Sequence, residues 1–374
     1  MIEAITTESG FERLGDAWRE LQDRSASRSL FLTWEWLFTW WKNLSATRRL
    51  MILAVRQQGR IVAIAPLAIR PASASRLLPF RALELLGNGS VGSDYLDLIV
   101  ERGCQTEAIP EIAEHLGTLS LPLELTQVLL EGSSARLLAD SLAPQGWRVA
   151  TTRTNVCPFV SLAGLDWPTY VASLGGSHRS NLQRRIRGLE RIDKLRLDPV
   201  RSEDERREAL DRLIALHNAR WGQLGGSDAF HTREMVMFHH DLSGRALREG
   251  WLRLMVLRVG RSPVAYFYGF RREATFYFYQ SAFDPAWSDR SVGLVTMGLA
   301  IRSAIEEGAG EFDMLHGDEG YKRHWAPAQR TIGRLELHPP MLRGRITSGA
   351  AALGRMARTI GRGLLRAPAG GSRA

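Results

Sequence analysis

Residues 276–325 constrain the fold more than any other part of this 374-residue chain. They begin with an aromatic run that predicts a strand, Phe276–Ala282, and continue through a turn that contains Gly293. Apolar residues then recur at helical spacing from about Leu294 to Glu307, and glycines follow where the predicted helix ends. A second short strand, Phe312–Leu315, closes the unit. A helix that opens after such a turn directs free N–H groups outward, which predicts a phosphate or pyrophosphate site.

Composition places the chain among globular proteins of two domains. Hydrophobic residues make up 44% of the chain and charged residues 24%, which is enough apolar material for packed cores. The tryptophan-rich segment FLTWEWLFTWW near the start is interpreted as a core helix, with a stacking platform for a sugar or an acyl chain as the alternative. The two cysteines belong to no metal-binding motif, so we expect reduced thiols and no metal site.

The basic charge of the chain is concentrated at its C-terminal end. Residues 341–374 hold seven arginines and no acidic residue, so the preceding residues keep only +2 of the net charge of +9. A nearly neutral body gives no support for DNA binding. The tail has an apolar helical stripe, which predicts either contact with an anionic membrane surface or a solubilising tail. Since neither a signal peptide nor an apolar run of membrane-spanning length is seen, we expect a cytoplasmic protein that is membrane-associated only through this tail.

The order of predicted elements repeats along the chain. Each half has helices, then a hairpin around a short glycine-bearing turn, then strand, helix and strand. We therefore predict an α+β fold of two tandem units, each a mainly antiparallel mixed sheet flanked by helices. The predicted domains are residues 1–165 and 166–340, followed by the tail at 341–374. The glycine loop at Gly87–Gly89 lacks a phosphate-binding pattern, so the first unit is predicted to be structural and to shape the substrate site.

The second unit resembles the GNAT acyltransferase fold, in which hairpin, strand, glycine turn, helix and strand follow in this order. GNAT enzymes bind the pyrophosphate of acyl-CoA with a turn of pattern Q/R-x-x-G-x-G/A. The first four positions are matched by Arg290, Ser291, Val292 and Gly293. Val295 stands where the pattern expects Gly or Ala.

A finer resemblance covers most of residues 30–335. The stretches SNLQRRIRGLERI, ALHNARW and GLVTMGLAIRSAIEEGAGEFDMLHGDEGYKRHW, together with the tryptophan-rich segment, are similar to the CelD-like acetyltransferases of cellulose and exopolysaccharide biosynthesis. FemAB-type transferases also have tandem GNAT-like units, but they use aminoacyl-tRNA in place of CoA. The resemblance therefore implies an acyl or aminoacyl transferase.

The resemblance also implies roles for individual residues. Free N–H groups of a strand that splays from its neighbour would hold the acyl carbonyl, and the candidates are Gln280, Ser281 and Ala282. The glycine turn would bind the diphosphate of acetyl-CoA or another acyl-CoA. Tyr321 is the candidate general acid for the leaving thiolate, because an ordinary tyrosine pKa of about 10 keeps its hydroxyl protonated at neutral pH. The candidates that would take the proton of the acceptor amine are Asp313, His316 and Asp318.

Further residues are candidates for substrate binding. They are Arg179 and Arg184 of the basic segment 178–191, Trp221, Glu319 and Lys322. Each has a simpler interpretation as a solvated or structural side chain. The basic segment would meet an anionic substrate, or the tRNA if the donor is an aminoacyl-tRNA.

Three functions follow from the sequence. The first is an acyl-CoA-dependent N-acyltransferase, such as an acetyltransferase, that acts on a sugar or sugar-nucleotide precursor of surface polysaccharide. The second is a FemAB-type aminoacyl-tRNA-dependent transferase that acts on a cell-wall precursor. The third is a non-catalytic accessory protein of polysaccharide synthesis with a GNAT fold, for which Val295 is the main support.

Overall fold

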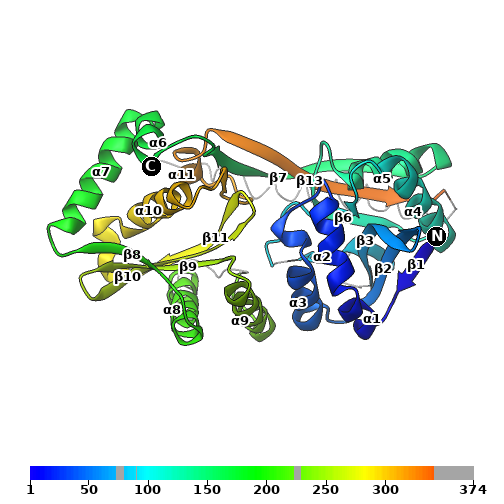
Figure 1. The fold of residues 1–374 in the computed structure, drawn as a ribbon, viewed down its shortest axis with the longest axis horizontal. Helices are drawn as coiled ribbons and strands as arrows, with labels where there is room; N and C mark the ends of the chain where they lie inside the picture. Colours follow the sequence, from blue (N-terminus) through cyan, green and yellow to red (C-terminus); the bar gives the residue numbers. More distant parts are fainter. Residues whose placement is uncertain (73–79, 90, 223–228, 341–374) are drawn as a thin grey trace, which may run out of the picture.

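The computed structural model describes residues 1–72, 80–89, 91–222 and 229–340. Predictions for the tail at 341–374 lie outside these residues. Figure 1 shows two halves side by side, the N-terminal half in blue to cyan and the C-terminal half in green to yellow. Among the described helices, none combines the length and the apolar character that crossing a membrane requires.

The N-terminal half follows the predicted order of helices, hairpin, strand, helix and strand. Its elements are β1 (Ile2–Ile5), α1 (Glu8–Arg13), α2 (Gly15–Arg24), η1 (Leu30–Leu32), α3 (Trp34–Leu44), β2 (Arg49–Gln57), β3 (Arg60–Arg70), β4 (Ala82–Leu85), β5 (Ile99–Val100), α4 (Gln105–Leu119), β6 (Leu123–Leu129), α5 (Ser134–Leu142), η2 (Ala143–Gln145) and β7 (Arg148–Ser161). The tryptophan-rich segment forms α3, whose start is capped by the Thr33 side chain accepting from the Trp36 N–H.

The C-terminal half repeats this order. Its elements are α6 (Trp167–Ser173), α7 (Gly176–Glu190), β8 (Leu195–Pro199), α8 (Glu203–Gly222), α9 (Arg233–Arg248), β9 (Leu252–Val259), β10 (Ser262–Arg272), β11 (Thr275–Phe283), η3 (Pro285–Arg290), α10 (Val292–Glu306), β12 (Glu311–Asp313), α11 (Gly320–Arg323) and β13 (Ala328–His338). Helix α10 begins two residues before the predicted Leu294, and β12 ends at Asp313 rather than at Leu315.

The described strands form one sheet that continues through both halves. Its order is β1-β2-β3-β4-β6-β13-β7-β12-β11-β10-β9-β8, with β5 paired to β3. The long antiparallel pair β7–β13 joins the two halves, because β13 also pairs with β6 while β7 also pairs with β12. Figure 1 shows this pair running along both halves. The last described strand therefore completes the sheet of the first half, across the predicted boundary at 165/166. The fold is the predicted mainly antiparallel mixed sheet flanked by helices.

One hydrophobic core also extends across the two halves. It joins α3 of the first half to α9 and the central strands of the second. Trp36 and Trp40 are fully buried, which supports the core-helix interpretation of this segment. The Trp36 ring contacts the rings of Phe238 and Phe270 with centroid distances of 5.4 and 5.9 Å. The two halves are therefore held against each other by a packed aromatic contact and by a shared sheet.

Candidate active site

Strands β11 and β12 separate partway along their length. They pair in parallel only from Thr275/Glu311 to Tyr277/Asp313. Beyond that point Tyr279 forms a bulge in β11, because Tyr268 of β10 pairs with Gln280 and Gly269 pairs with Phe278. A bulge bends the strand that carries it. We call the region beyond the last β11–β12 pair the strand opening.

The strand opening exposes a backbone donor on β11. The Ser281 N–H donates to Oε1 of its neighbour Gln280 at 3.0 Å, and this bond involves no other strand. A side-chain amide can move aside when a stronger acceptor arrives. Ser281 therefore offers the N–H donor that stabilisation of an acyl carbonyl requires.

Helix α10 begins beside this opening with unpartnered N–H groups. Its N-cap, Ser291, is left-handed with φ of +55° and makes no side-chain capping bond. The first intrahelical donors are Leu294 and Val295, which bond to the Ser291 carbonyl, so the N–H groups of Val292 and Gly293 have no partner among the described residues. A Cβ placed on Gly293 would lie 3.4 Å from the Phe283 ring, an ordinary contact. The fold alone does not demand glycine here, so a need for glycine would come from a ligand.

A large basic cavity connects the strand opening with the start of α10. It has a volume of about 1560 Å³ and is lined by α7, the last residues of β11, the first turn of α10 and the segment after β12. We call it the basic cavity. Its charged lining residues are Arg184, Arg185, Arg187, Arg220 and Glu319. With four arginines and one carboxylate, the described lining favours an anionic ligand.

Seven of the sequence-predicted site residues line the basic cavity. They are Arg184, Gln280, Ser281, Ser291, Gly293, Glu319 and Tyr321. The Tyr321 side chain is about half exposed, at 46%. Partial burial and the neighbouring Glu319 carboxylate raise the pKa of Tyr321 above its ordinary value, so the hydroxyl keeps its proton at neutral pH.

Other predicted donor-binding residues have different positions. The side chains of Ala282 and Val292 are buried in the core, so only their backbones face the strand opening and the helix start. Arg290 is exposed at the end of η3 and does not line the basic cavity. Arg179 donates from Nη1 to the Ala172 carbonyl at 2.9 Å. Trp221 lies in the last turn of α8, and its side chain is outside the described part of the structure.

The candidates at the end of β12 are distributed over different environments. Asp313 is buried and accepts from the Tyr95 hydroxyl at 2.8 Å, away from the basic cavity. Burial raises the pKa of Asp313 to about 7. Asp318 is exposed and forms an ion pair with Arg323. Lys322 is buried, at 4% exposure, and donates to backbone carbonyls. None of these three lines the basic cavity.

Three histidines line the basic cavity alongside these residues: His178, His217 and His324. The rings of His178 and His324 stack with a centroid distance of 5.3 Å, and burial together with His324 lowers the pKa of His178. Burial and then Arg220 lower the pKa of His217 to about 4, so it is neutral at physiological pH. The segment ALHNARW was a signal for His217, whereas no local pattern pointed to His178 and His324, which meet only after α7 and α11 fold together.

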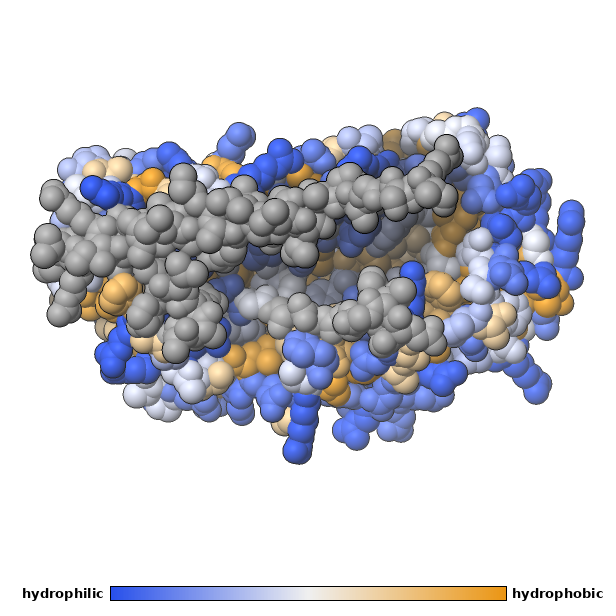
Figure 2. All heavy atoms as spheres, turned by 180° about the vertical axis from the view of Figure 1, so that it is seen from behind, coloured by the Kyte–Doolittle hydropathy of each residue, from blue (hydrophilic) through white to orange (hydrophobic). Residues whose placement is uncertain are grey.

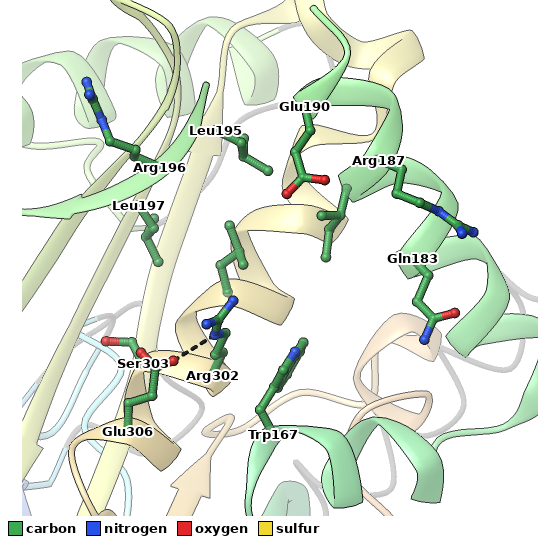
Figure 3. Close-up of a pocket in the computed structure, with 12 residues that line it drawn as sticks. Trp167, Gln183, Arg187, Glu190, Leu195, Arg196, Leu197, Arg302, Ser303 and Glu306 are labelled. Atoms are coloured by element: carbon green, nitrogen blue, oxygen red, sulfur yellow. Dashed lines mark hydrogen bonds and ion pairs between the residues drawn. The ribbon is translucent and has the colours of Figure 1, made fainter. Parts of the chain in front are cut away.

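A second cavity lies on the other side of α7. Its volume is about 550 Å³, and Arg187 is shared with the lining of the basic cavity. Figure 3 shows Trp167 and Glu190 directed toward this cavity, whereas the Arg187 and Gln183 side chains point away from it. Arg302 crosses its floor and donates to Glu306 on the same helix at 2.7 Å. Among the described residues no group of three or more histidine, cysteine or acidic side chains converges on a metal-binding arrangement.

Seen from the face opposite to Figure 1, the molecule has an elongated hollow in its middle (Figure 2). Residues of mixed polarity line this hollow, with hydrophobic residues visible in its floor. The molecule therefore has a concave face.

Comparison with known proteins agrees with this geometry. Residues 176–323 match the family described as acetyltransferase (GNAT) domain. This segment carries an acyltransferase domain of the GNAT type. The match begins at α7 and ends within α11, so it includes every described residue that lines the basic cavity except Gly175, His324 and Trp325. No match was found among curated protein sequences.

Solved structures extend the likeness beyond the GNAT domain. FemX is 10% identical, with a TM-score of 0.62 over 91% of this chain and 98% of FemX. A conserved protein of unknown function from Bacteroides thetaiotaomicron is 14% identical, with a TM-score of 0.57 over 90% of this chain and all of that protein. L-PGS from Bacillus licheniformis is 12% identical, with a TM-score of 0.51 over 91% of this chain and 96% of the solved chain. At these identities the likeness shows the fold, and it covers both halves.

Proposed function

We propose that this protein is an acyl-CoA-dependent N-acyltransferase that acts on the amine of a sugar or sugar-nucleotide precursor of surface polysaccharide. The observation that carries the donor assignment is the basic cavity at the start of α10. There the unpartnered N–H groups of Val292 and Gly293 adjoin a lining with four arginines. A helix start of this kind binds the oxygen atoms of a phosphate or diphosphate.

The strand opening supports the acyl-transfer step. A thioester held beside Ser281 would have its carbonyl oxygen stabilised by the Ser281 N–H as the tetrahedral intermediate forms. Tyr321, protonated at neutral pH, would donate a proton to the leaving thiolate. The proposed carbohydrate acceptor comes from the resemblance to the CelD-like group, and the neutral His217 lies in the cavity wall.

Val295 has a structural explanation that is compatible with catalysis. Its side chain is fully buried in the core formed with β9 and β10, and it does not line the basic cavity. The residue therefore leaves the helix start open although the family pattern expects Gly or Ala at this position. The main support for a non-catalytic accessory protein is thereby removed.

An aminoacyl-tRNA donor is the second candidate. Two observations favour it: α7 contributes three arginines to the basic cavity, and the fold likeness to FemX includes both halves of the chain. An RNA donor would be bound through many phosphates, so its affinity would fall steeply with salt concentration.

Calorimetric titration with acetyl-CoA and with desulfo-CoA tests the proposed donor. Both ligands carry the diphosphate, so both should bind the full chain, and Gly293→Trp should abolish binding of both by filling the start of α10. Gly188→Trp is the matched control, because Gly188 lies in α7 with open space at its Cβ and outside the cavity lining. If neither ligand binds the wild-type protein while alanyl-tRNA binds in a salt-dependent manner, the donor is the tRNA.

A further inference from the structure

The turn after β12 is held rigidly although it lies outside regular structure. Each of its four consecutive N–H groups donates to a defined acceptor: Met314 to the Pro158 carbonyl at 2.9 Å, Leu315 to Asp313 Oδ1 at 2.8 Å, His316 to Asp94 Oδ2 at 2.8 Å and Gly317 to the Val156 carbonyl at 3.0 Å. The buried Lys322 ammonium donates to the His316 carbonyl at 2.7 Å and to the Leu315 carbonyl at 3.4 Å. The backbone of His316 is thus fixed from both sides.

Leu315 adopts a backbone conformation that is costly for its residue type. Its φ is +55°, in the left-handed region that a bulky side chain rarely enters. Such strained residues persist only where the surroundings over-determine them, and they concentrate at functional sites. Here the strain turns the chain so that the next residue, His316, leaves the sheet.

The partner of His316 comes from the other half of the protein. Asp94 is fully buried and lies in the loop that follows β4. It accepts from the His316 N–H and from His316 Nδ1 at 2.9 Å, and it also accepts from Gln127 Nε2 at 3.1 Å. Gly92 of the same loop has φ of +68°, and a Cβ placed on it would lie 3.7 Å from both the His316 ring and the Tyr279 hydroxyl. The loop is therefore shaped to receive the histidine.

This arrangement leaves one nitrogen of the imidazole available. When His316 is neutral, the carboxylate of Asp94 keeps the proton on Nδ1, so Nε2 carries the lone pair. Nε2 has no hydrogen-bond partner among the described residues, and the His316 side chain is 36% exposed. An oriented histidine with a free lone pair is equipped to accept a proton.

His316 lies close to the wall of the basic cavity. The β11–β12 pairing aligns Thr275 with Glu311 and Tyr277 with Asp313. Beyond these pairs the left-handed Leu315 turns the chain out of this register. Lys322, which donates to the His316 carbonyl, also forms an ion pair at 3.1 Å with Glu319, and Glu319, Gln280 and Ser281 all line the basic cavity.

We propose that His316 is the general base for the acceptor and that Asp94 of the N-terminal half is its positioning residue. This proposal rests on the acyl-transfer function proposed above. The acceptor nitrogen bonds to the thioester carbonyl carbon, its proton passes to His316 Nε2, the carbon–sulfur bond breaks, and the thiolate takes its proton from Tyr321. The N-terminal half is then part of the catalytic apparatus rather than only a structural support.

The charged surroundings of His316 set the sign of the expected pH dependence. Burial alone would lower the pKa of His316, but the hydrogen bond and the negative charge of Asp94 outweigh burial, so the pKa lies above its ordinary value. Lys322 opposes this shift and Glu319 adds to it, while the Tyr279 hydroxyl across Gly92 is protonated at neutral pH. Activity should therefore rise with pH through a pKa above about 6.5, as His316 loses its proton.

Kinetics of the full chain test the role of the pair. The assay follows release of the CoA thiol from acetyl-CoA with glucosamine as the amine probe. His316→Gln should lower kcat by about 10²-fold or more and leave the Kd for acetyl-CoA unchanged, because general-base catalysis contributes on that scale. Asp94→Asn keeps an acceptor for the His316 N–H, and it should lower kcat and move the ascending limb of the pH profile to lower pH. His115→Gln, on α4 and remote from the pair, is the control. Wild-type kcat in His316→Gln would overturn the proposal.

Nitrogen-15 NMR of the histidine rings gives a readout that does not depend on the donor. The His316 signals are assigned by their loss in His316→Gln. We expect the Nδ1–H tautomer at high pH and a pKa that falls in Asp94→Asn. An Nε2–H tautomer, or a pKa that is the same in both proteins, would overturn the pairing even if acetyl-CoA binds. If acetyl-CoA does not bind, the kinetic comparison is made on deacylation of alanyl-tRNA, so a failed donor assignment is distinguished from a failed base assignment.

Discussion

In each half of the protein two strands pair in parallel over a few residues. The space beyond their last pair is filled by a loop in the N-terminal half and stays open in the C-terminal half. In the N-terminal half β4 and β6 pair in parallel at Leu83/Leu123, as β11 and β12 do at Thr275/Glu311 in the C-terminal half. Beyond the β4–β6 pairs, the loop after β4 occupies the space, and its Leu96 N–H donates to the Gln127 carbonyl of β6 at 3.0 Å. The corresponding β11–β12 opening borders the basic cavity.

The length of one connection accounts for this difference. The segment between β4 and α4 is long enough to fold back between its own strands, whereas η3 alone joins β11 to α10 and leaves the helix start exposed to the cavity. The filled half is not passive, however. The loop that fills it carries Asp94 to His316 of the open half. The comparison teaches that a repeated unit whose own strand opening is filled can still supply a residue to the strand opening of the other half.

Among the substitutions that test this comparison, the largest effect is expected at Tyr321. If the open half performs the chemistry, Tyr321→Phe should lower kcat for acetyl-CoA by about 10²-fold, because the thiolate loses its proton donor. The Kd for acetyl-CoA measured by calorimetry should stay the same, since the ring remains in the cavity wall. An unchanged kcat would place the proton donor elsewhere.

The next largest effect concerns the rigidity of the open half. Lys322→Met should lower the free energy of unfolding by about 2 kcal/mol, because two buried carbonyls lose a charged donor. Urea denaturation measures this change. The exposed Lys194 gives the control, since Lys194→Met should alter stability by no more than about 0.5 kcal/mol. Equal stability of both variants would contradict a structural role for the buried ammonium.

A smaller effect should come from the basic wall of the cavity. Arg184→Gln should weaken acetyl-CoA binding by about tenfold, the loss expected for one charge-assisted phosphate contact. Arg191→Gln removes the same charge just after α7, outside the cavity lining, and should leave the Kd unchanged. Calorimetry at low and high salt distinguishes the two. Equal weakening by both substitutions would mean that only the overall charge matters.

The smallest effect is expected at the helix start of the filled half. Gln105 opens α4 as Val292 opens α10, and it accepts from the Gly103 N–H at 2.9 Å. Gln105→Trp should leave the Kd for acetyl-CoA within about twofold of wild type, as surface substitutions away from a site do. A large loss of affinity would show that the filled half also holds a donor site, and the comparison would then fail.

Much of the fold could be predicted from local sequence patterns. Local hydrophobic patterns located α3, α10 and the repeated order of helices, hairpin, strand, helix and strand, because these patterns depend only on neighbouring residues. The end of β12 could not be predicted in this way. Met314 and Leu315 continue the apolar pattern of a strand, but Leu315 is left-handed, and its neighbours Met314 and His316 donate to Pro158 and Asp94, far away in the chain.

The candidate site likewise contains residues that local patterns could predict and residues that they could not. Gly293 and Ser291 could be found because a local motif defines the turn between β11 and α10. Asp94 could not, since it lies 222 residues before His316 and its own segment carries no catalytic pattern. The strand exchange of β7 and β13 is equally invisible to local patterns, because pairing partners far apart in the chain are chosen by the sheet as a whole.

The sequence by itself determined which segments are helices and strands, that the unit repeats, and where a helix start with free N–H groups would lie. These properties are set by backbone hydrogen bonding and by the spacing of apolar residues over a few turns. Only the tertiary structure decided which of the two repeated openings stays open, and it joined Asp94 to His316 across the two halves. The physical reason is that burial and strand pairing are satisfied by the whole sheet at once, so one loop fills a space that the other half leaves free.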